Sequence, residues 1–420
     1  MTRGSVWHPF TQHALQPETI EISAGEGAWL TSSSGARILD LISSWWVVTH
    51  GHRHPRIVQA IKDQTDRLDQ VIFAGFTHRP AEELSRRLLD RLGGVFAHVF
   101  FSDSGSTAVE VALKMALGFW RNQGEKRTRI IALEYAYHGD TIGTMSTGAR
   151  GVFNASYAPL LFDVVRLPFP AKGTEDATLS ALRDACRDGG AAALIIEPLL
   201  LGAGGMLAYA PDVLREMQTI CWESGALLIA DEVMTGFGRT GTFTACEQAG
   251  VRPDIMCLAK GLTGGSMPLA VTVCAKAIFD AHYSTDRTKT FFHSSSYTAN
   301  PIACAAAVAN LDVWDEEPVQ ERIDAISEWQ ESFIAEFAGD SRFTNARVRG
   351  TISAVDMVVE DQGYLSGVGP KLYDFFIARG LLIRPLGNTI YLMPPYCITH
   401  EELAGAHAAI RDGVGMVGSQ

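Results

Sequence analysis

The fold is decided by two stretches, GALLIADEV at residues 225–233 and DIMCLAKG at residues 254–261. Each is a short apolar run that ends in charged residues, Asp231 and Glu232 in the first and Lys260 in the second. Apolar runs of this length, without polar alternation, are typical of strands that are buried on both faces. The sequence therefore predicts two interior strands of a covered sheet, with charged side chains where they end.

Strand and helix patterns alternate through the first three quarters of the chain. The further predicted strands are 95–103, 129–137 and 191–198. The predicted helices between them include 108–120, 178–187 and 211–225. Alternation of this kind predicts an α/β fold in which helices cover both faces of a mostly parallel sheet, in three α/β/α layers.

The last hundred residues have a different pattern. A long helix is predicted at 319–338, followed by strands at 351–359 and 389–395 with a helix between them. This order predicts a smaller α+β domain. We therefore predict an N-terminal segment (1–43) that contributes to the small domain, a large α/β domain (44–314) and a C-terminal small domain (315–420).

Composition restricts the class of protein. With 420 residues, 47% hydrophobic and 20% charged, the chain is expected to be a globular enzyme. A net charge of -12 argues against a nucleic-acid partner, and no basic run or long apolar stretch predicts contact with a membrane. The N-terminus lacks the apolar core of a secretory signal, and the seven scattered cysteines predict reduced thiols. We therefore expect a cytoplasmic protein.

Lys260 is the most unusual of the eight lysines. It alone follows an apolar run and precedes a glycine-rich turn, GLTGGS. Burial of an ammonium group is costly, so a lysine at this position is expected to have a lowered pKa or a covalent role, such as a Schiff base. Asp231 ends the other strand, where a carboxylate often simply reaches solvent.

Together, Lys260 and Asp231 are the pair that a pyridoxal cofactor needs, an amine for its aldehyde and a carboxylate for its ring nitrogen. The turn at 104–107, SGST, precedes a predicted helix and could bind a phosphate with backbone N–H groups, although such a turn by itself is usually a plain N-cap. Tyr137 and His138 follow a strand and could either stack on the ring or pack in the core.

Other catalytic motifs are weak or missing. LGAGGM at 201–206 lacks the third glycine of a dinucleotide site, and the chain has no Walker, HExxH or G-x-S-x-G motif. His50, His52 and His54 alternate in a polar turn without a nearby acid or cysteine, so no metal site is predicted.

These residues resemble a known family. DEVMTGFGRTG at 231–241, with a lysine 29 residues after Asp231, and EYAYHGDT at 134–141 are similar to the class III aminotransferases, whose fold is type I of the pyridoxal-phosphate-dependent transferases. The resemblance covers nearly the whole chain. It implies pyridoxal 5'-phosphate as cofactor, small-molecule substrates, and a homodimer whose active sites are shared across the interface.

Narrower motifs resemble one branch of this family. They are WHPFTQ at 7–12, ISSWWVVTHGHRHP at 42–55, FSDSGSTAVEVALKMAL at 101–117 and IRPLGNTIYLMPPY at 383–396. Members of that branch aminate 8-amino-7-oxononanoate to 7,8-diaminononanoate in biotin biosynthesis, usually with S-adenosylmethionine as the amino donor. The resemblance implies the same reaction here.

The resemblance also implies roles for the cofactor residues. Lys260 matches the residue that forms the Schiff base and later moves the proton, and Asp231 matches the partner of the pyridine nitrogen. Gly105 and Ser106 match the phosphate loop. Tyr137 matches the residue that stacks on the ring and touches the substrate.

Substrate residues are implied in the same way. Trp46 matches a wall of the substrate pocket, and Arg384 matches the residue that holds the carboxylate of the oxononanoate. Without the surrounding motif, Arg384 would be interpreted as a strand-end arginine paired with a surface acid. Arg239 and Glu197 lie in matching segments and are expected to have supporting roles.

The chain departs from the family at two places. HSSSYTANP at 293–301 stands where relatives usually have a segment like HGPTFxGNP, so that Ser294 and Ser295 replace a glycine and a proline that approach cofactor and substrate. Ser296 replaces a threonine that reaches the phosphate of the neighbouring subunit, and it keeps the hydroxyl. Phe10, a predicted substrate residue, stands where several relatives have a tyrosine.

Several alternatives stay open from sequence. Lysine could replace S-adenosylmethionine as donor, because the Phe10 position lacks the hydroxyl. The chain could be an ω-amino acid or diamine transaminase, or an aminomutase or racemase on the same fold. A non-catalytic binding protein is a further alternative, against which the presence of both Lys260 and Asp231 argues.

Overall fold

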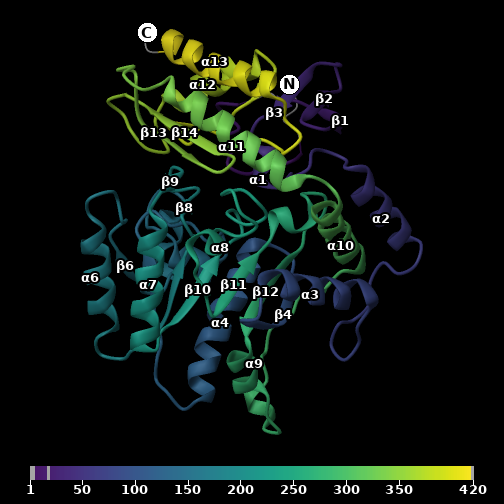
Figure 1. The fold of residues 1–420 in the computed structure, drawn as a ribbon, viewed down its shortest axis with the longest axis vertical. Coiled ribbons are helices and arrows are strands. Elements are labelled where there is room, and N and C mark those ends of the chain that lie inside the picture. The colour runs from purple at the N-terminus through teal and green to yellow at the C-terminus, as the bar shows by residue number, and fades with distance from the viewer. Residues whose placement is uncertain (1–4, 17–18, 418–420) are drawn as a thin grey trace.

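The computed structural model describes residues 5–16 and 19–417. Its centre is a seven-stranded sheet (Figure 1). In spatial order the strands are β4 (Phe96–Ser102), β12 (Ala270–Ala275), β11 (Ile255–Leu258), β10 (Leu227–Asp231), β7 (Ala191–Ile196), β5 (Arg129–Leu133) and β6 (Val165–Leu167). β12 runs antiparallel to both of its neighbours, and the other pairs are parallel. The predicted mostly parallel α/β sheet is confirmed, whereas β12 was not predicted.

The sheet is covered on both faces because its central strands are apolar on both sides. In β10 every residue is buried. Leu227 and Ile229 pack in the same cluster as α4 (Gly105–Asn122), whereas Leu228 and Ala230 pack in the cluster that contains α7 (Pro211–Ser224). Successive side chains of a strand point to opposite faces, so one five-residue strand holds a helix on each side.

A second group of elements lies above this sheet in Figure 1 and contains both ends of the described chain. Its three-stranded antiparallel sheet has the order β13 (Phe343–Arg349), β14 (Ile352–Met357), β16 (Thr389–Leu392). The accompanying helices are α11 (Val319–Ala335), α12 (Val368–Ile377) and α13 (His400–Val417). The helix and strands predicted in the last hundred residues are confirmed.

The N-terminal segment joins this second group through a mixed sheet. β1 (Ile22–Glu26), β2 (Trp29–Ser32) and β3 (Arg37–Asp40) are antiparallel, and β3 pairs in parallel with β15 (Leu381–Leu382). The domain boundaries themselves stay a prediction. α1 (Ser43–Trp46) spans the first predicted boundary, and α10 (Pro301–Glu316) spans the second.

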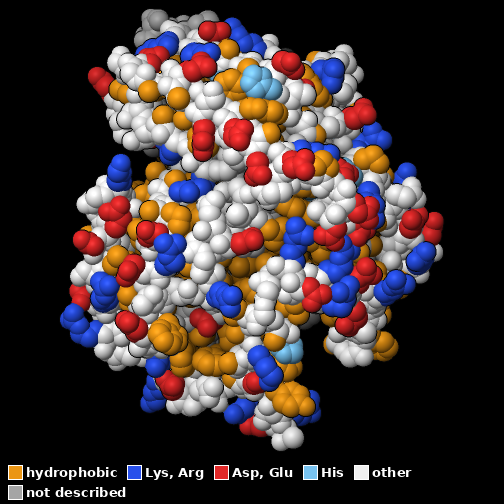
Figure 2. Space-filling view, in the orientation of Figure 1, with side chains coloured by type: hydrophobic (Ala, Val, Ile, Leu, Met, Phe, Trp, Pro, Cys, Tyr) orange, Lys and Arg blue, Asp and Glu red, His pale blue; other side chains and the backbone are white. Residues whose placement is uncertain are grey.

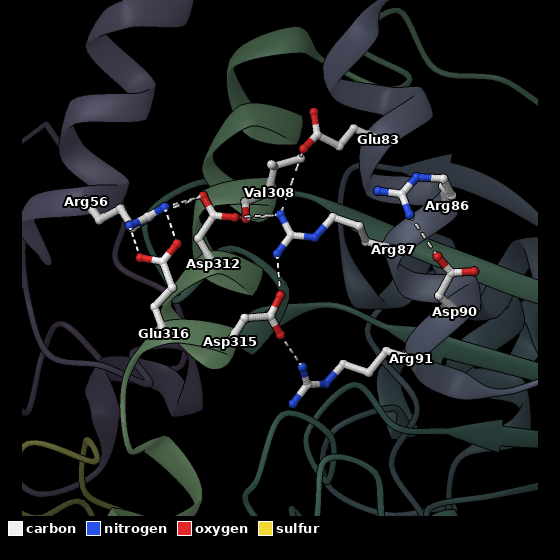
Figure 3. Close-up of polar contacts among 10 residues, drawn as sticks. All are labelled: Arg56, Glu83, Arg86, Arg87, Asp90, Arg91, Val308, Asp312, Asp315 and Glu316. Carbon is white, nitrogen blue, oxygen red and sulfur yellow. Dashed lines mark hydrogen bonds and ion pairs between the residues drawn. The ribbon is translucent and has the colours of Figure 1, made fainter.

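Three helices on one side of the molecule are joined by ion pairs (Figure 3). α10 contributes Asp312, Asp315 and Glu316 to basic residues of α2 (Pro55–Thr65) and α3 (Arg79–Leu92). Figure 2 shows side chains of both signs gathered over these helices. This charged surface, which we call the α10 network, lies apart from the cavity described below.

The remaining elements are short. They are α5 (Ile142–Thr147), η1 (Ala155–Leu160), β8 (Leu200–Leu201), β9 (Leu207–Ala208), α6 (Glu175–Cys186), α8 (Ala245–Ala249), η2 (Lys260–Thr263), α9 (Lys276–His282) and η3 (Arg287–Lys289). All seven cysteines are free thiols. Over residues 5–16 and 19–417, no helix combines the length and apolarity needed to cross a membrane.

Candidate active site

A cavity of about 790 Å³ lies at the carboxyl ends of the sheet strands, where parallel α/β sheets bind ligands. Residues from β10, from the turn after β11, from α1 and from the start of α4 all line it. The predicted site residues on its wall are Phe10, Trp46, Gly105, Ser106, Tyr137, Asp231, Lys260 and Arg384. One cavity therefore contains most of the residues that were selected from separate parts of the sequence.

Lys260 is the first residue of η2 and has a positive φ of 46°, which is unusual for a lysine. Its Nζ lies 4.8 Å from the ring centroid of Trp46. In the described part of the chain no carboxylate lies within ion-pair distance of this amine. Burial lowers the pKa of Lys260 to about 8, and the charges of Asp231 and Glu197 oppose the shift. A substantial fraction of the amine is therefore neutral near pH 8, as a nucleophile must be.

Asp231 is held by a histidine that lies directly behind it. The Nδ1–H of His138 donates to Oδ2 of Asp231 (2.7 Å), and the N–H of Val233 donates to Oδ1 (3.1 Å). Both Asp231 and His138 are buried. The sequence analysis named His138 only beside Tyr137 and did not predict this pairing, which could have been sought because His138 also follows a strand end.

The turn before α4 is both an N-cap and a cradle. Ser104 and Thr107 form a capping box, so the N-cap interpretation is confirmed. A Cβ on Gly105 would lie 2.5 Å from Cγ1 of Val233, and a Cβ on Gly139 would lie 2.1 Å from Oγ of Ser106. The backbone is therefore packed too closely for side chains at Gly105 and Gly139, and the start of α4 lines the cavity. Anions favour this position on a helix.

These residues suit pyridoxal 5'-phosphate. An amine without an acid partner, a buried carboxylate and a helix N-terminus line the same cavity. The cofactor needs one group of each kind, for its aldehyde, its ring nitrogen and its phosphate.

The opposite wall is aromatic and ends in Arg384. The indole N–H of Trp46 donates to the hydroxyl of Tyr391 (2.8 Å), a contact that was not predicted. The guanidinium carbon of Arg384 lies 5.5 Å from the ring centroid of Trp45, and its Nη2 donates to the carbonyl of Phe10 (3.1 Å). Among the described residues no carboxylate pairs with Arg384, which favours a ligand-binding role over a strand-end arginine paired with a surface acid.

Ser294, Ser295 and Ser296 do not line the cavity of their own chain. They lie in a segment bounded by the exposed side chains of Phe292 and Tyr297. Hydrogen bonds within the segment hold it, for example from the N–H of Ser295 to a threonine hydroxyl three residues later (2.9 Å). A single chain therefore does not bring these predicted residues to Lys260.

Two further residues have distinct surroundings. Glu197 follows β7, and its two carboxylate oxygens accept the N–H groups of Tyr137 and Gly202, both at 2.9 Å. Burial raises the pKa of Glu197 to about 7. Arg239 is buried outside the cavity and donates to the carbonyls of Val48 and Pro394, so it connects two loops.

The three alternating histidines serve separate contacts. His50 bonds to Asn310, His52 to Asp40 and His54 to Glu317. The residues that the structure describes contain no group of three or more potential metal ligands.

Comparison with known proteins establishes the family. Residues 10–414 match the family described as aminotransferase class III. The chain is a class III aminotransferase. Among its relatives, an adenosylmethionine-8-amino-7-oxononanoate aminotransferase of Synechococcus elongatus is 47% identical over 97% of this chain and 97% of the relative. One of Geobacter sulfurreducens with the same name is 38% identical over 96% and 93%.

Solved structures confirm the fold type. An adenosylmethionine-8-amino-7-oxononanoate aminotransferase from Methanocaldococcus jannaschii has a TM-score of 0.93 at 30% identity, covering 98% of this chain and 97% of that structure. A PLP-bound amine transaminase from an uncultivated Pseudomonas species also has a TM-score of 0.93, at 31% identity, with 99% of each chain covered. The predicted membership of class III and the predicted fold type I are therefore confirmed.

Proposed function

We propose that this aminotransferase transfers an amino group to the ketone of 8-amino-7-oxononanoate and forms 7,8-diaminononanoate, with pyridoxal 5'-phosphate as cofactor and S-adenosylmethionine as donor. The observation that carries the proposal is Arg384, a guanidinium without an acid partner in the described chain, on the aromatic wall of the cavity that contains Lys260. The names of the relatives support the same substrate.

Bound pyridoxal 5'-phosphate supplies a ring that withdraws electrons from the reacting carbon. The chain supplies the remaining parts. Lys260 is the attachment point, and its Nζ moves the proton between the reacting atoms. Asp231, positioned by His138, keeps a negative charge at the ring nitrogen, while Gly105 and Ser106 bind the phosphate through the start of α4.

The acceptor fits the rest of the cavity. Its apolar chain would lie along Trp46 and Tyr137, and its carboxylate would accept two parallel hydrogen bonds from Arg384. Because the Arg384 contacts in the structure are one carbonyl and one aromatic ring, most of its donors are available to a ligand. Phe10 lines this end of the cavity, with its carbonyl bonded to Arg384 and its ring centroid 5.5 Å from that of Trp45.

We further propose a homodimer in which Ser294, Ser295 and Ser296 of one copy complete the cofactor and substrate site of the other. The support is that this segment lies outside its own cavity and is flanked by exposed aromatic side chains. The seven free thiols support a reducing compartment, and we propose the cytoplasm.

The test is a pair of half-reactions followed by the absorbance of the cofactor. Purified enzyme loaded with pyridoxal phosphate is mixed separately with S-adenosylmethionine, lysine and alanine. We expect S-adenosylmethionine to convert the cofactor to its amine form, and 8-amino-7-oxononanoate to restore it. Conversion by lysine alone would change the donor. Restoration by pyruvate or oxoglutarate but not by 8-amino-7-oxononanoate would favour an ω-amino acid transaminase.

Arg384→Ala tests the acceptor site. Loss of charge-assisted hydrogen bonds of about 1.5–3 kcal/mol corresponds to a rise of about 10- to 150-fold in the half-saturating concentration of 8-amino-7-oxononanoate. The donor half-reaction is expected to change little. Arg379→Ala is the matched control. The guanidinium carbon of Arg379 lies 3.6 Å from the ring centroid of Phe375, and Arg379 does not line the cavity. Equal losses for donor and acceptor would remove the proposed role of Arg384.

A further inference from the structure

One charged group on the cavity wall has no assigned function. Glu197 is 5% exposed and lines the cavity together with Asp231 and Lys260. Its carboxylate accepts only two backbone N–H groups, those of Tyr137 and Gly202. In the described part of the chain no lysine, arginine or histidine forms an ion pair with it.

A carboxylate in this environment is costly to keep charged. Burial raises the pKa of Glu197 to about 7, and repulsion from Asp231 adds to the shift. The charge of His138 and the two backbone hydrogen bonds oppose it and compensate only part of the loss of hydration. A cationic ligand group placed beside it would regain the missing interaction. The protein therefore has a ready site for a cation next to Lys260.

The acceptor has a cation in a matching place. In 8-amino-7-oxononanoate the amine is on the carbon next to the ketone, and the carboxylate is at the other end of the chain. If the carboxylate binds Arg384 and the ketone lies near Lys260, the amine lies at the Lys260 end. Of the two other acids on the wall, Asp231 already bonds to His138 and Asp103 precedes the phosphate turn.

We propose that the carboxylate of Glu197 binds the non-reacting ammonium group of the acceptor and thereby selects ketones that have an amine on the adjacent carbon over plain keto acids. This inference rests on the proposed function, because it takes the acceptor from there. It assigns Glu197 to substrate recognition, whereas the reacting proton stays with Lys260.

Glu232 provides a matched control. It is also a buried glutamate at the end of a sheet strand, and it also accepts backbone N–H groups, those of Ala245 and Cys246. Unlike Glu197, it does not line the cavity. Glu232→Gln therefore reproduces the loss of a buried carboxylate without changing the charge of the cavity.

The experiment compares two ketones, 8-amino-7-oxononanoate and 7-oxononanoate, which lacks the amine. Each is mixed rapidly with enzyme in the pyridoxamine phosphate form, and the absorbance change gives a half-saturating concentration and a limiting rate. We expect Glu197→Gln to raise the half-saturating concentration of the amino ketone at least about tenfold and to leave that of 7-oxononanoate within about twofold. Glu232→Gln is expected to preserve the wild-type preference.

Arg384→Ala separates this inference from the proposed function. It removes the carboxylate contact that both ketones share, so it should weaken both equally. If neither ketone reacts with the wild-type enzyme, the proposed function fails. If both react and Glu197→Gln weakens both equally or neither, the proposed function stands and the role of Glu197 is overturned.

A crystal structure of the wild-type enzyme with the amino ketone gives a second test that needs no variant. We expect the amine nitrogen to lie within about 3.5 Å of a Glu197 carboxylate oxygen, which is the upper limit for a hydrogen bond. An amine that points away from Glu197 would overturn the inference, even if Glu197→Gln fails to fold.

Discussion

The α10 network and the cavity contain the same kinds of charged side chains in opposite circumstances. In the network, Arg87 contacts Asp312 (2.6 Å) and Asp315 (2.7 Å), and the other cations of Figure 3 likewise have acid partners. In the cavity, Lys260, Glu197 and Arg384 form no ion pair within the described chain, although Asp231 and Glu197 act on Lys260 from a longer distance. The charges of the network are thus paired within the folded chain, and those of the cavity are not.

This difference separates charges that position helices from charges that are left for ligands. Each ion pair near the surface contributes little to the free energy of unfolding, so the loss of one pair destabilises the protein only slightly. An unpaired charge inside a cavity reduces stability, and it is retained where it has a use. Changes to the cavity charges should therefore alter cofactor attachment or substrate binding, whereas changes to the network should alter stability alone.

The largest effect is expected for Lys260→Ala. Without the amine, the visible absorption of the bound cofactor should be lost, and the rate of transamination should fall by a factor of about 10³ or more. Spectra and steady-state rates measure both. Lys276→Ala is the matched control, because Lys276 pairs with Asp280 on the surface. A visible band that persists in Lys260→Ala would mean that another lysine holds the cofactor.

The sequence predicts those site residues that belong to a local pattern, and it does not predict contacts between distant parts of the chain. Lys260 and Asp231 could be selected because each ends a local apolar run, and parallel strands bring such ends together. The direction of β12 could not be predicted, since it depends on pairing with β4 and β11, which are far apart in the chain.

The partners of the site residues were also beyond the sequence. His138 bonds to Asp231 across 93 positions, and Trp46 bonds to Tyr391 across 345. No periodicity encodes such contacts, because they arise from how strands and loops pack after the chain has folded. The absence of an ion pair at Glu197 in the described chain belongs to the same class, since a missing contact leaves no motif.

The second prediction tests whether Ser296 of a second copy completes the cavity that contains Lys260. Lys260→Ala and Ser296→Asp are each expected to lose most activity, the latter because an added anion opposes the phosphate. If the sites are shared, mixing the two variants under conditions of subunit exchange should restore activity, because one site of each heterodimer has both native residues. Lack of recovery despite exchange would place Ser296 in its own chain's site or outside any site.

The third prediction uses the pKa of Lys260, about 8 in the cofactor-free enzyme. Below that value the amine is protonated and cannot attack an aldehyde. The rate of covalent uptake of pyridoxal phosphate should therefore fall about tenfold per pH unit below 8 and level off above it. Stopped-flow absorbance measures this rate. A profile still rising steeply above pH 9 would contradict the lowered pKa.

In the network, Arg87→Ala should have the largest effect on stability. The Arg87 side chain is 15% exposed and holds two acids of α10. Its loss removes both contacts and leaves Asp312 with Arg56 and Asp315 with Arg91, with an expected cost of about 1–2 kcal/mol in the free energy of unfolding. Urea denaturation of the loaded enzyme measures the change, and turnover should stay at the wild-type value. A large loss of turnover would mean that the network also positions the cavity.

Arg86→Ala should have the smallest effect, and it compares the α10 network with an ion pair formed inside a single helix. Arg86 is on the same helix as Arg87, but its side chain is 65% exposed and its partner Asp90 lies one turn along α3. An exposed pair of this spacing contributes about 0.3–0.5 kcal/mol. At about 1 M salt the screening length is about 3 Å, so the Arg86 contribution should disappear. More of the Arg87 contribution should remain, because its ion pairs are partly buried. If both variants lose the same stability and respond equally to salt, burial does not distinguish these ion pairs. The contrast between network and cavity then rests only on how many ion-pair partners each charged side chain has.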